Sequence, residues 1–170
     1  KYRVGLVAIL LCALFSLLLT GFNELGYAAD GRPVIIVDIE GPITPASDDF
    51  LKSGLAQARE RNAKLVVIRL NTPGGLLTSM QSMVENLLSS TVPTVVYVSP
   101  SGAGAVSAGV FITLAGNFAV MAPGTTIGAA HPVTGGGGDI GGDMRAKVEN
   151  FSVSLIKAIA EQRKRNVKWA

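Results

Sequence analysis

Short, uninterrupted runs of apolar and β-branched residues recur along the chain, and segments with helical spacing lie between them. The predicted strands are residues 34–39, 65–70, 94–99 and 118–121. The predicted helices are residues 47–62 with Ser47 as the cap, 76–90, 107–115 and 144–165, and the Gly-rich residues 125–142 are expected to be irregular. This alternation predicts an α/β fold with a parallel β-sheet built from repeated βα units and right-handed crossovers. Because the apolar residues of these strands are largely continuous rather than alternating with polar ones, we expect both faces of the sheet to be covered.

A longer apolar run precedes these elements. Residues 4–22 follow Lys1 and Arg3, and the run is interrupted only by small or hydroxyl residues. Its length suits an N-terminal hydrophobic helix that spans a bilayer, whereas the small residues Gly26 and Ala28 suit cleavage by a signal peptidase. Both alternatives remain open, and both place the rest of the chain outside the cytoplasm, because the positive charge stays inside. We therefore expect a signal peptide or membrane anchor at residues 1–29 and one domain at residues 30–170.

Composition excludes several classes of function. Among 170 residues, 48% are hydrophobic and only 16% are charged, which excludes a disordered chain. A single Cys excludes a disulfide framework, and a single His argues against a His-cluster metal site. The net charge of +3 lies largely at the chain ends, which does not suit a nucleic-acid surface. A GxGxxG pattern at residues 136–141 has no strand directly before it, so we expect no nucleotide, metal or other cofactor.

Candidate chemistry lies at the carboxyl ends of two predicted strands, the edge where such folds place their sites. Gly74 and Gly75 follow the second strand, and without a Cβ they can present backbone N–H groups. Ser107 follows the third strand, at the start of a helix and among small residues that leave its hydroxyl uncrowded. A nucleophile beside backbone donors is what acyl transfer requires. The alternative is that Ser107 is simply a small residue required for packing.

A serine nucleophile needs a base, and two residues qualify. Lys147 shares a helix face with Phe151 and Leu155, so we expect it to point partly inward, where loss of water would lower its pKa. The alternative is a lysine at the helix edge with its ammonium group in water. His131, after the fourth strand, is the other candidate base, or else a residue that shapes the pocket.

Four motifs together resemble the NfeD-type membrane-bound serine proteases, relatives of ClpP and the signal peptide peptidases with the ClpP/crotonase fold. The motifs are residues 71–75 (NTPGG), 105–109 (AVSAG), 127–133 (IGAAHPV) and 147–150 (KVEN). The resemblance implies a serine endopeptidase with Ser107 as nucleophile and Lys147 as base. It also implies that the oxyanion donors are the amides of Gly74 or Gly75 and of Ala108.

The same resemblance implies partners and a setting. Such proteases cleave hydrophobic segments, accompany stomatin-like membrane proteins and form dimers or larger homo-oligomers. Phe151 stands where the pattern often has Asp, and Asn71 also stands where Asp is common. The family continues beyond the helix that ends this chain, so we expect an N-terminal fragment of the protease. Two other hypotheses are a non-catalytic membrane scaffold that binds a stomatin-like protein, and an acyl-CoA enzyme of the crotonase type.

Overall fold

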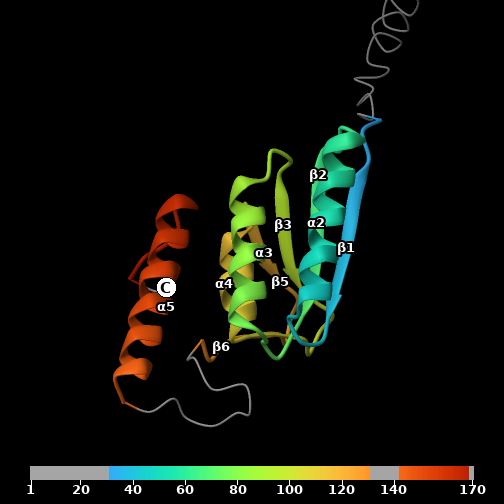
Figure 1. Cartoon of the computed structure of the whole chain (residues 1–170). Coiled ribbons are helices and arrows are strands. Elements are labelled where there is room, and N and C mark those ends of the chain that lie inside the picture. The colour runs from blue at the N-terminus through green and yellow to red at the C-terminus, as the bar shows by residue number, and fades with distance from the viewer. Residues whose placement is uncertain (1–30, 131–141, 169–170) are drawn as a thin grey trace, which may run out of the picture. The chain divides into compact units, whose positions relative to one another are not determined.

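The computed structural model describes residues 31–130 and 142–168 (Figure 1). All described elements belong to one compact unit, residues 32–170. The predicted N-terminal segment, residues 1–29, lies outside the described residues. Within the described ranges, no helix is long and apolar enough to cross a membrane.

The main sheet has four parallel strands in the order β1-β2-β3-β5. These strands are β1 (Val34–Glu40), β2 (Leu65–Asn71), β3 (Thr94–Val98) and β5 (Phe118–Met121). The predicted parallel α/β fold is confirmed, and the four strands lie within one residue of their expected bounds. Two short strands were not predicted, β4 (Gly104–Val106) and β6 (Thr126–Gly128), which form a separate parallel pair. Strand β6 therefore corrects the expectation that residues 125–142 are irregular throughout.

Three helices connect strands, and a fourth follows the last strand. They are α2 (Pro45–Glu60), α3 (Leu77–Ser89), α4 (Ala108–Ala115) and α5 (Gly142–Gln162). Helix α2 begins two residues earlier than predicted, because Thr44 is its cap and Pro45 occupies the first turn. Ser47 closes a capping box with Thr44 instead of capping the helix itself: the Thr44 N–H donates to Ser47 Oγ at 2.9 Å.

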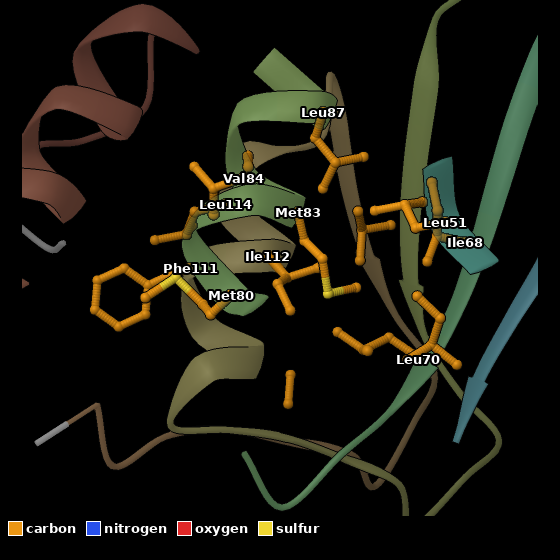
Figure 2. Close-up of a cluster of buried hydrophobic side chains, with 14 of the residues drawn as sticks. Leu51, Ile68, Leu70, Met80, Met83, Val84, Leu87, Phe111, Ile112 and Leu114 are labelled. Carbon is orange, nitrogen blue, oxygen red and sulfur yellow. The ribbon is translucent and has the colours of Figure 1, made fainter. Parts of the chain in front are cut away.

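The core lies between the sheet and helices α2, α3 and α4. Figure 2 shows Met83 and Leu87 of α3 directed toward Ile68 of β2, with Ile112 of α4 beside them. All four side chains are fully buried. Helix α4 is buried along its whole length, which explains its small and apolar composition.

The opposite face of the sheet is bare in the part of the chain that the structure describes. One row across the strands is apolar, yet its ends are open, with Ile36 58% and Phe118 60% exposed. The next row carries Asp38, Arg69 and Tyr97, and Arg69 donates two hydrogen bonds to the Asp38 carboxylate. The expectation that both faces are covered is therefore wrong for the described residues. A largely apolar strand indicates that both faces of the sheet suit an apolar contact. It does not indicate whether the contacting residues belong to the same chain.

Helix α5 is attached to the domain through its C-terminal half. Ile156, Ile159 and Ala160 are buried. Just beyond them, the Arg163 guanidinium donates to the carbonyls of Leu87 and Ala115, both at 2.7 Å. Arg165 donates to the carbonyls of Leu114 and Gly116, and burial lowers the pKa of both guanidinium groups. These carbonyls belong to the C-terminal ends of α3 and α4, where cations are favoured.

Candidate active site

Ser107 occupies the turn between β4 and α4 and has an unusual backbone conformation. Its φ is +53° and its ψ is −111°, outside the regions open to ordinary L-residues. Two backbone hydrogen bonds hold this turn: Ser107 N–H donates to Gly128 O at 2.9 Å, and Val110 N–H donates to Ser107 O at 3.0 Å. The Ser107 side chain is half-buried and does not cap α4. Its hydroxyl is therefore left available at a strained strand-to-helix turn, a geometry found at nucleophilic serines.

The small residues around Ser107 are explained by close packing. A Cβ added at Gly109 would lie 2.8 Å from Thr72 Cγ2 and 3.3 Å from Ala105 Cβ. Helix α4 can therefore begin this close to the end of β2 only with glycine at that position. Gly109 is thus required by the packing, in a sequence that also suits an uncrowded hydroxyl.

The Gly74-Gly75 turn lies directly against Ser107, as the sequence predicted. Gly74 has φ +116°, and a Cβ added there would lie 2.8 Å from Ser107 Cβ and 3.2 Å from Ser107 Oγ. A Cβ on Gly75 would lie 2.2 Å from the carbonyl oxygen of Ile43. Both glycines are therefore needed for close approach, one toward the serine and the other toward the backbone before α2.

The backbone amides around Ser107 differ in whether they are already engaged. Gly74 N–H donates to Thr72 Oγ1 at 3.1 Å. In contrast, the N–H groups of Gly75 and Ala108 donate no hydrogen bond within the described part of the chain. Ala108 opens α4, so its amide has no acceptor inside the helix. Of the predicted donors, Gly75 and Ala108 are thus the two with free N–H groups.

Lys147 is not joined to Ser107 in this structure. Its side chain is exposed, and no hydrogen bond connects it to Ser107 among the described residues. The first described residue of α5 that is buried is Ser152, five positions further along the helix. Phe151, on the same helix face, is itself 40% exposed. The expectation that Lys147 points partly inward is therefore wrong here, because the buried residues of α5, such as Ser152 and Ile156, lie on the other side of the helix.

The second candidate base, His131, lies outside the described residues, as does the GxGxxG pattern at residues 136–141. Across residues 31–130 and 142–168, no cluster of His, Cys, Asp and Glu could hold a metal ion. Around Ser107, the described residues present a hydroxyl and backbone amides.

Sequence reasoning missed the contribution of Thr72 to this site. Thr72 is 1% exposed and pairs with Ala105 in an isolated parallel bridge that joins the end of β2 to β4. A hydroxyl residue two positions before a glycine is a signal for a local side-chain turn, and it was present in the NTPGG motif.

Comparison with known proteins gives a consistent result. The family model "NfeD1b, N-terminal domain" matches residues 33–170. Membrane-bound protease PH1510 of Pyrococcus horikoshii is 36% identical over 136 residues, which are 78% of this chain and 30% of the relative. Membrane protein NfeD1b of Bacillus subtilis is 31% identical over 136 residues, which are 80% of this chain and 29% of the relative. The chain thus matches about a third of the length of these relatives.

Solved structures show the same likeness. The 1510-N membrane-bound stomatin-specific protease, solved as a serine-to-alanine mutant, superposes with a TM-score of 0.74 at 34% identity. The match covers 81% of this chain and 67% of the other. A lysine-to-alanine mutant of 1510-N, solved in complex with a substrate peptide, matches with the same TM-score and identity, over 81% of this chain and 63% of the other. ClpP1 of Listeria monocytogenes is only 17% identical, with a TM-score of 0.56 over 79% of this chain and 75% of the other, and shows that the fold is ClpP-like.

Proposed function

The chain belongs to the family of NfeD1b N-terminal domains, and we propose that it is a serine endopeptidase whose nucleophile is Ser107. The observation that carries the proposal is the strained turn at Ser107. Its hydroxyl does not cap α4 and packs on Gly74, and two free backbone amides lie beside it. The relatives named as proteases support the same class of reaction.

In the proposed mechanism, Ser107 Oγ attacks the scissile carbonyl while neutral Lys147 accepts the hydroxyl proton. The C–O bond forms, and the carbonyl oxygen becomes an oxyanion bound by the N–H groups of Gly75 and Ala108. When the C–N bond breaks, Lys147 returns its proton to the leaving amine. Water then hydrolyses the acyl-enzyme by the same route.

This mechanism requires a change in the surroundings of Lys147. A lysine acts as a general base only when it lies within reach of the hydroxyl and is removed from water. Met144 and Phe151, on either side of it, are 59% and 40% exposed, so the first turns of α5 offer an apolar surface that is not yet used. We propose that covering this surface when substrate binds brings Lys147 to Ser107 and removes its water.

Apolar segments of membrane proteins are the proposed substrates, including those of stomatin-like partners. Leu76 and Leu77, directly after the Gly pair, are 51% and 39% exposed, which suits an apolar peptide beside the oxyanion donors. The similar 1510-N structures are of a stomatin-specific protease, which favours the same class. The proposal includes a membrane setting, with residues 1–29 as a signal peptide or anchor and the domain on the extracytoplasmic side, and it requires no cofactor.

The bare sheet face is the proposed site of self-association, with a second copy of the chain as its occupant. An isologous contact must be complementary to itself. Here an apolar row that includes Ile36 and Phe118 lies beside a row in which Asp38 and Arg69 neutralise each other. These two rows can therefore be apposed without burying an unpaired charge, provided that Glu40, at the end of β1, stays at the edge of the contact.

The proposed function is tested by cleavage of a fluorogenic peptide with apolar residues around the scissile bond. Turnover by the wild type that is lost in Ser107→Ala and in Lys147→Ala supports the dyad. A non-catalytic scaffold is the second candidate, and the observation that favours it is the exposed Lys147 without a bond to Ser107. A folded wild type that binds a stomatin-like protein without cleaving any peptide would favour the scaffold.

A further inference from the structure

Thr72 lies where the two halves of the proposed oxyanion site meet. Its N–H donates to Gly104 O at 2.7 Å, and its carbonyl accepts from Val106 N–H at 3.0 Å. These bonds attach the end of β2 to β4, the strand that leads directly into Ser107. The backbone of Thr72 therefore fixes the position of the Gly74-Gly75 turn relative to the serine.

The Thr72 hydroxyl controls the orientation of one peptide group in that turn. Oγ1 accepts from Gly74 N–H and donates to Gly74 O, both at 3.1 Å. Gly74 O also accepts from Ile43 N–H at 2.8 Å. The C=O of Gly74 and the N–H of Gly75 belong to the same planar trans peptide, so they point in opposite directions. Holding Gly74 O on one side therefore directs the free Gly75 N–H to the other.

The Thr72 methyl group reaches the second half of the site. Cγ2 packs so closely on Gly109 that a Cβ there would lie only 2.8 Å away. Gly109 follows Ala108, whose N–H is the other free donor. One buried side chain thus contacts the backbone of both donor segments.

We propose that Thr72 is a positioning residue that aligns the Gly75 N–H with the oxyanion, through its hydroxyl rather than through its methyl group. This inference rests on the proposed function. It predicts that loss of the hydroxyl lowers kcat and leaves KM nearly unchanged, because the donor is needed most when negative charge develops. A misaligned donor is expected to cost a factor on the order of 10² in kcat.

The experiment compares kcat and KM for an apolar fluorogenic peptide in the full chain, for wild type, Thr72→Val and Thr72→Ser. The Val variant keeps the shape and loses the hydroxyl, whereas the Ser variant keeps the hydroxyl and loses the methyl group. Thr113→Val is the matched control. Thr113 is also 1% exposed and donates to Gly109 O at 2.7 Å, but it does not bond to the Gly74 turn. Thermal unfolding of each variant measures the structural effect separately.

We expect kcat to fall about 10²-fold in Thr72→Val and to stay within about threefold of wild type in Thr72→Ser and Thr113→Val. Wild-type kcat in a folded Thr72→Val overturns the inference. If Thr72→Val does not fold, Thr72→Ser decides. A kcat near that of wild type supports the role of the hydroxyl. A loss of about 10²-fold assigns the effect to the methyl group and overturns the inference. Failure of the proposed function has a different readout, since the wild type would then show no turnover that depends on Ser107.

Discussion

The backbone strain at Ser107 predicts that the Ser107→Gly variant is more stable to unfolding than Ser107→Ala, the reverse of the usual order. At φ +53° and ψ −111°, any side chain with a Cβ is held in an unfavourable backbone conformation. Such strain costs about 1–3 kcal/mol, and glycine avoids it. Against this gain, glycine loses about 0.5–1 kcal/mol more conformational entropy than alanine on folding. Removing a half-buried Cβ sacrifices a further few tenths of a kcal/mol of apolar burial.

The balance favours Ser107→Gly over Ser107→Ala by about 1 kcal/mol in the free energy of unfolding. At an ordinary helical position the order is reversed, and glycine is about 1 kcal/mol less stable than alanine. Ser53, exposed within α2, supplies that matched control as Ser53→Gly and Ser53→Ala. The difference in unfolding free energy between the Gly and Ala variants should therefore change by about 2 kcal/mol from position 53 to position 107. Denaturant unfolding resolves a difference of this size.

Urea unfolding followed by circular dichroism measures all four variants. The strain would be refuted if Ser107→Gly is less stable than Ser107→Ala by as much as Ser53→Gly is less stable than Ser53→Ala. That result would also remove the main geometric support for Ser107 as the nucleophile. Neither Ser107 variant should have peptidase activity. Stability gained together with activity lost is the pattern expected when strain is maintained for function.

Three further predictions concern the oxyanion turn, the bare sheet face and the exposed ion pair. Gly75→Ala should lower stability by at least about 2 kcal/mol by urea unfolding and abolish turnover, because the new Cβ meets the Ile43 backbone; unchanged stability would contradict the close approach. We expect the wild type to self-associate and the Ile36→Lys variant to be a monomer, as measured by light scattering. A wild type that is already monomeric would mean that another occupant covers this face. Hydrogen bonding by Arg69 lowers the pKa of Asp38 in the folded state. The native state is therefore stabilised above the unfolded pKa of about 4, and this stability is lost as the pH falls through the lower folded pKa. Asp38→Asn should therefore be slightly less stable than wild type at neutral pH and equal to it in acid; a gap in urea unfolding that does not vary with pH would contradict this.

Much of the fold follows from the sequence, because its strands are marked by local composition. The β-branched runs at residues 34–39 and 65–70 predict parallel strands, and the structure has them as β1 and β2, although β1 is buried on one face only. The three-residue strands β4 and β6 have no such signal. They exist because they pair with each other and because Thr72, at the end of β2, pairs with β4. Short strands of this kind depend on tertiary contacts, so residue patterns do not indicate them.

The candidate site was predictable in part for the same reason. The Gly74-Gly75 turn and Ser107 were placed together because parallel strands bring their carboxyl ends to one edge. The positive φ at Ser107 and the free amide of Gly75 could not be predicted, since both depend on hydrogen bonds between distant segments. Lys147 was misjudged because helical spacing shows which residues share a face of α5 but not whether that face is packed.

The central claim, that Ser107 is a nucleophile activated by Lys147, is tested most directly by a fluorophosphonate probe with mass-spectrometric location of the adduct. The labelling rate is measured between about pH 7 and 10 on the wild type, Ser107→Ala and Lys147→Ala, each shown to be folded. We expect an adduct on Ser107 in the wild type, no adduct in Ser107→Ala, and labelling slower by a factor of about 10²–10⁴ in Lys147→Ala. A folded wild type that is not labelled, or a Lys147→Ala variant labelled at the wild-type rate, would contradict the claim.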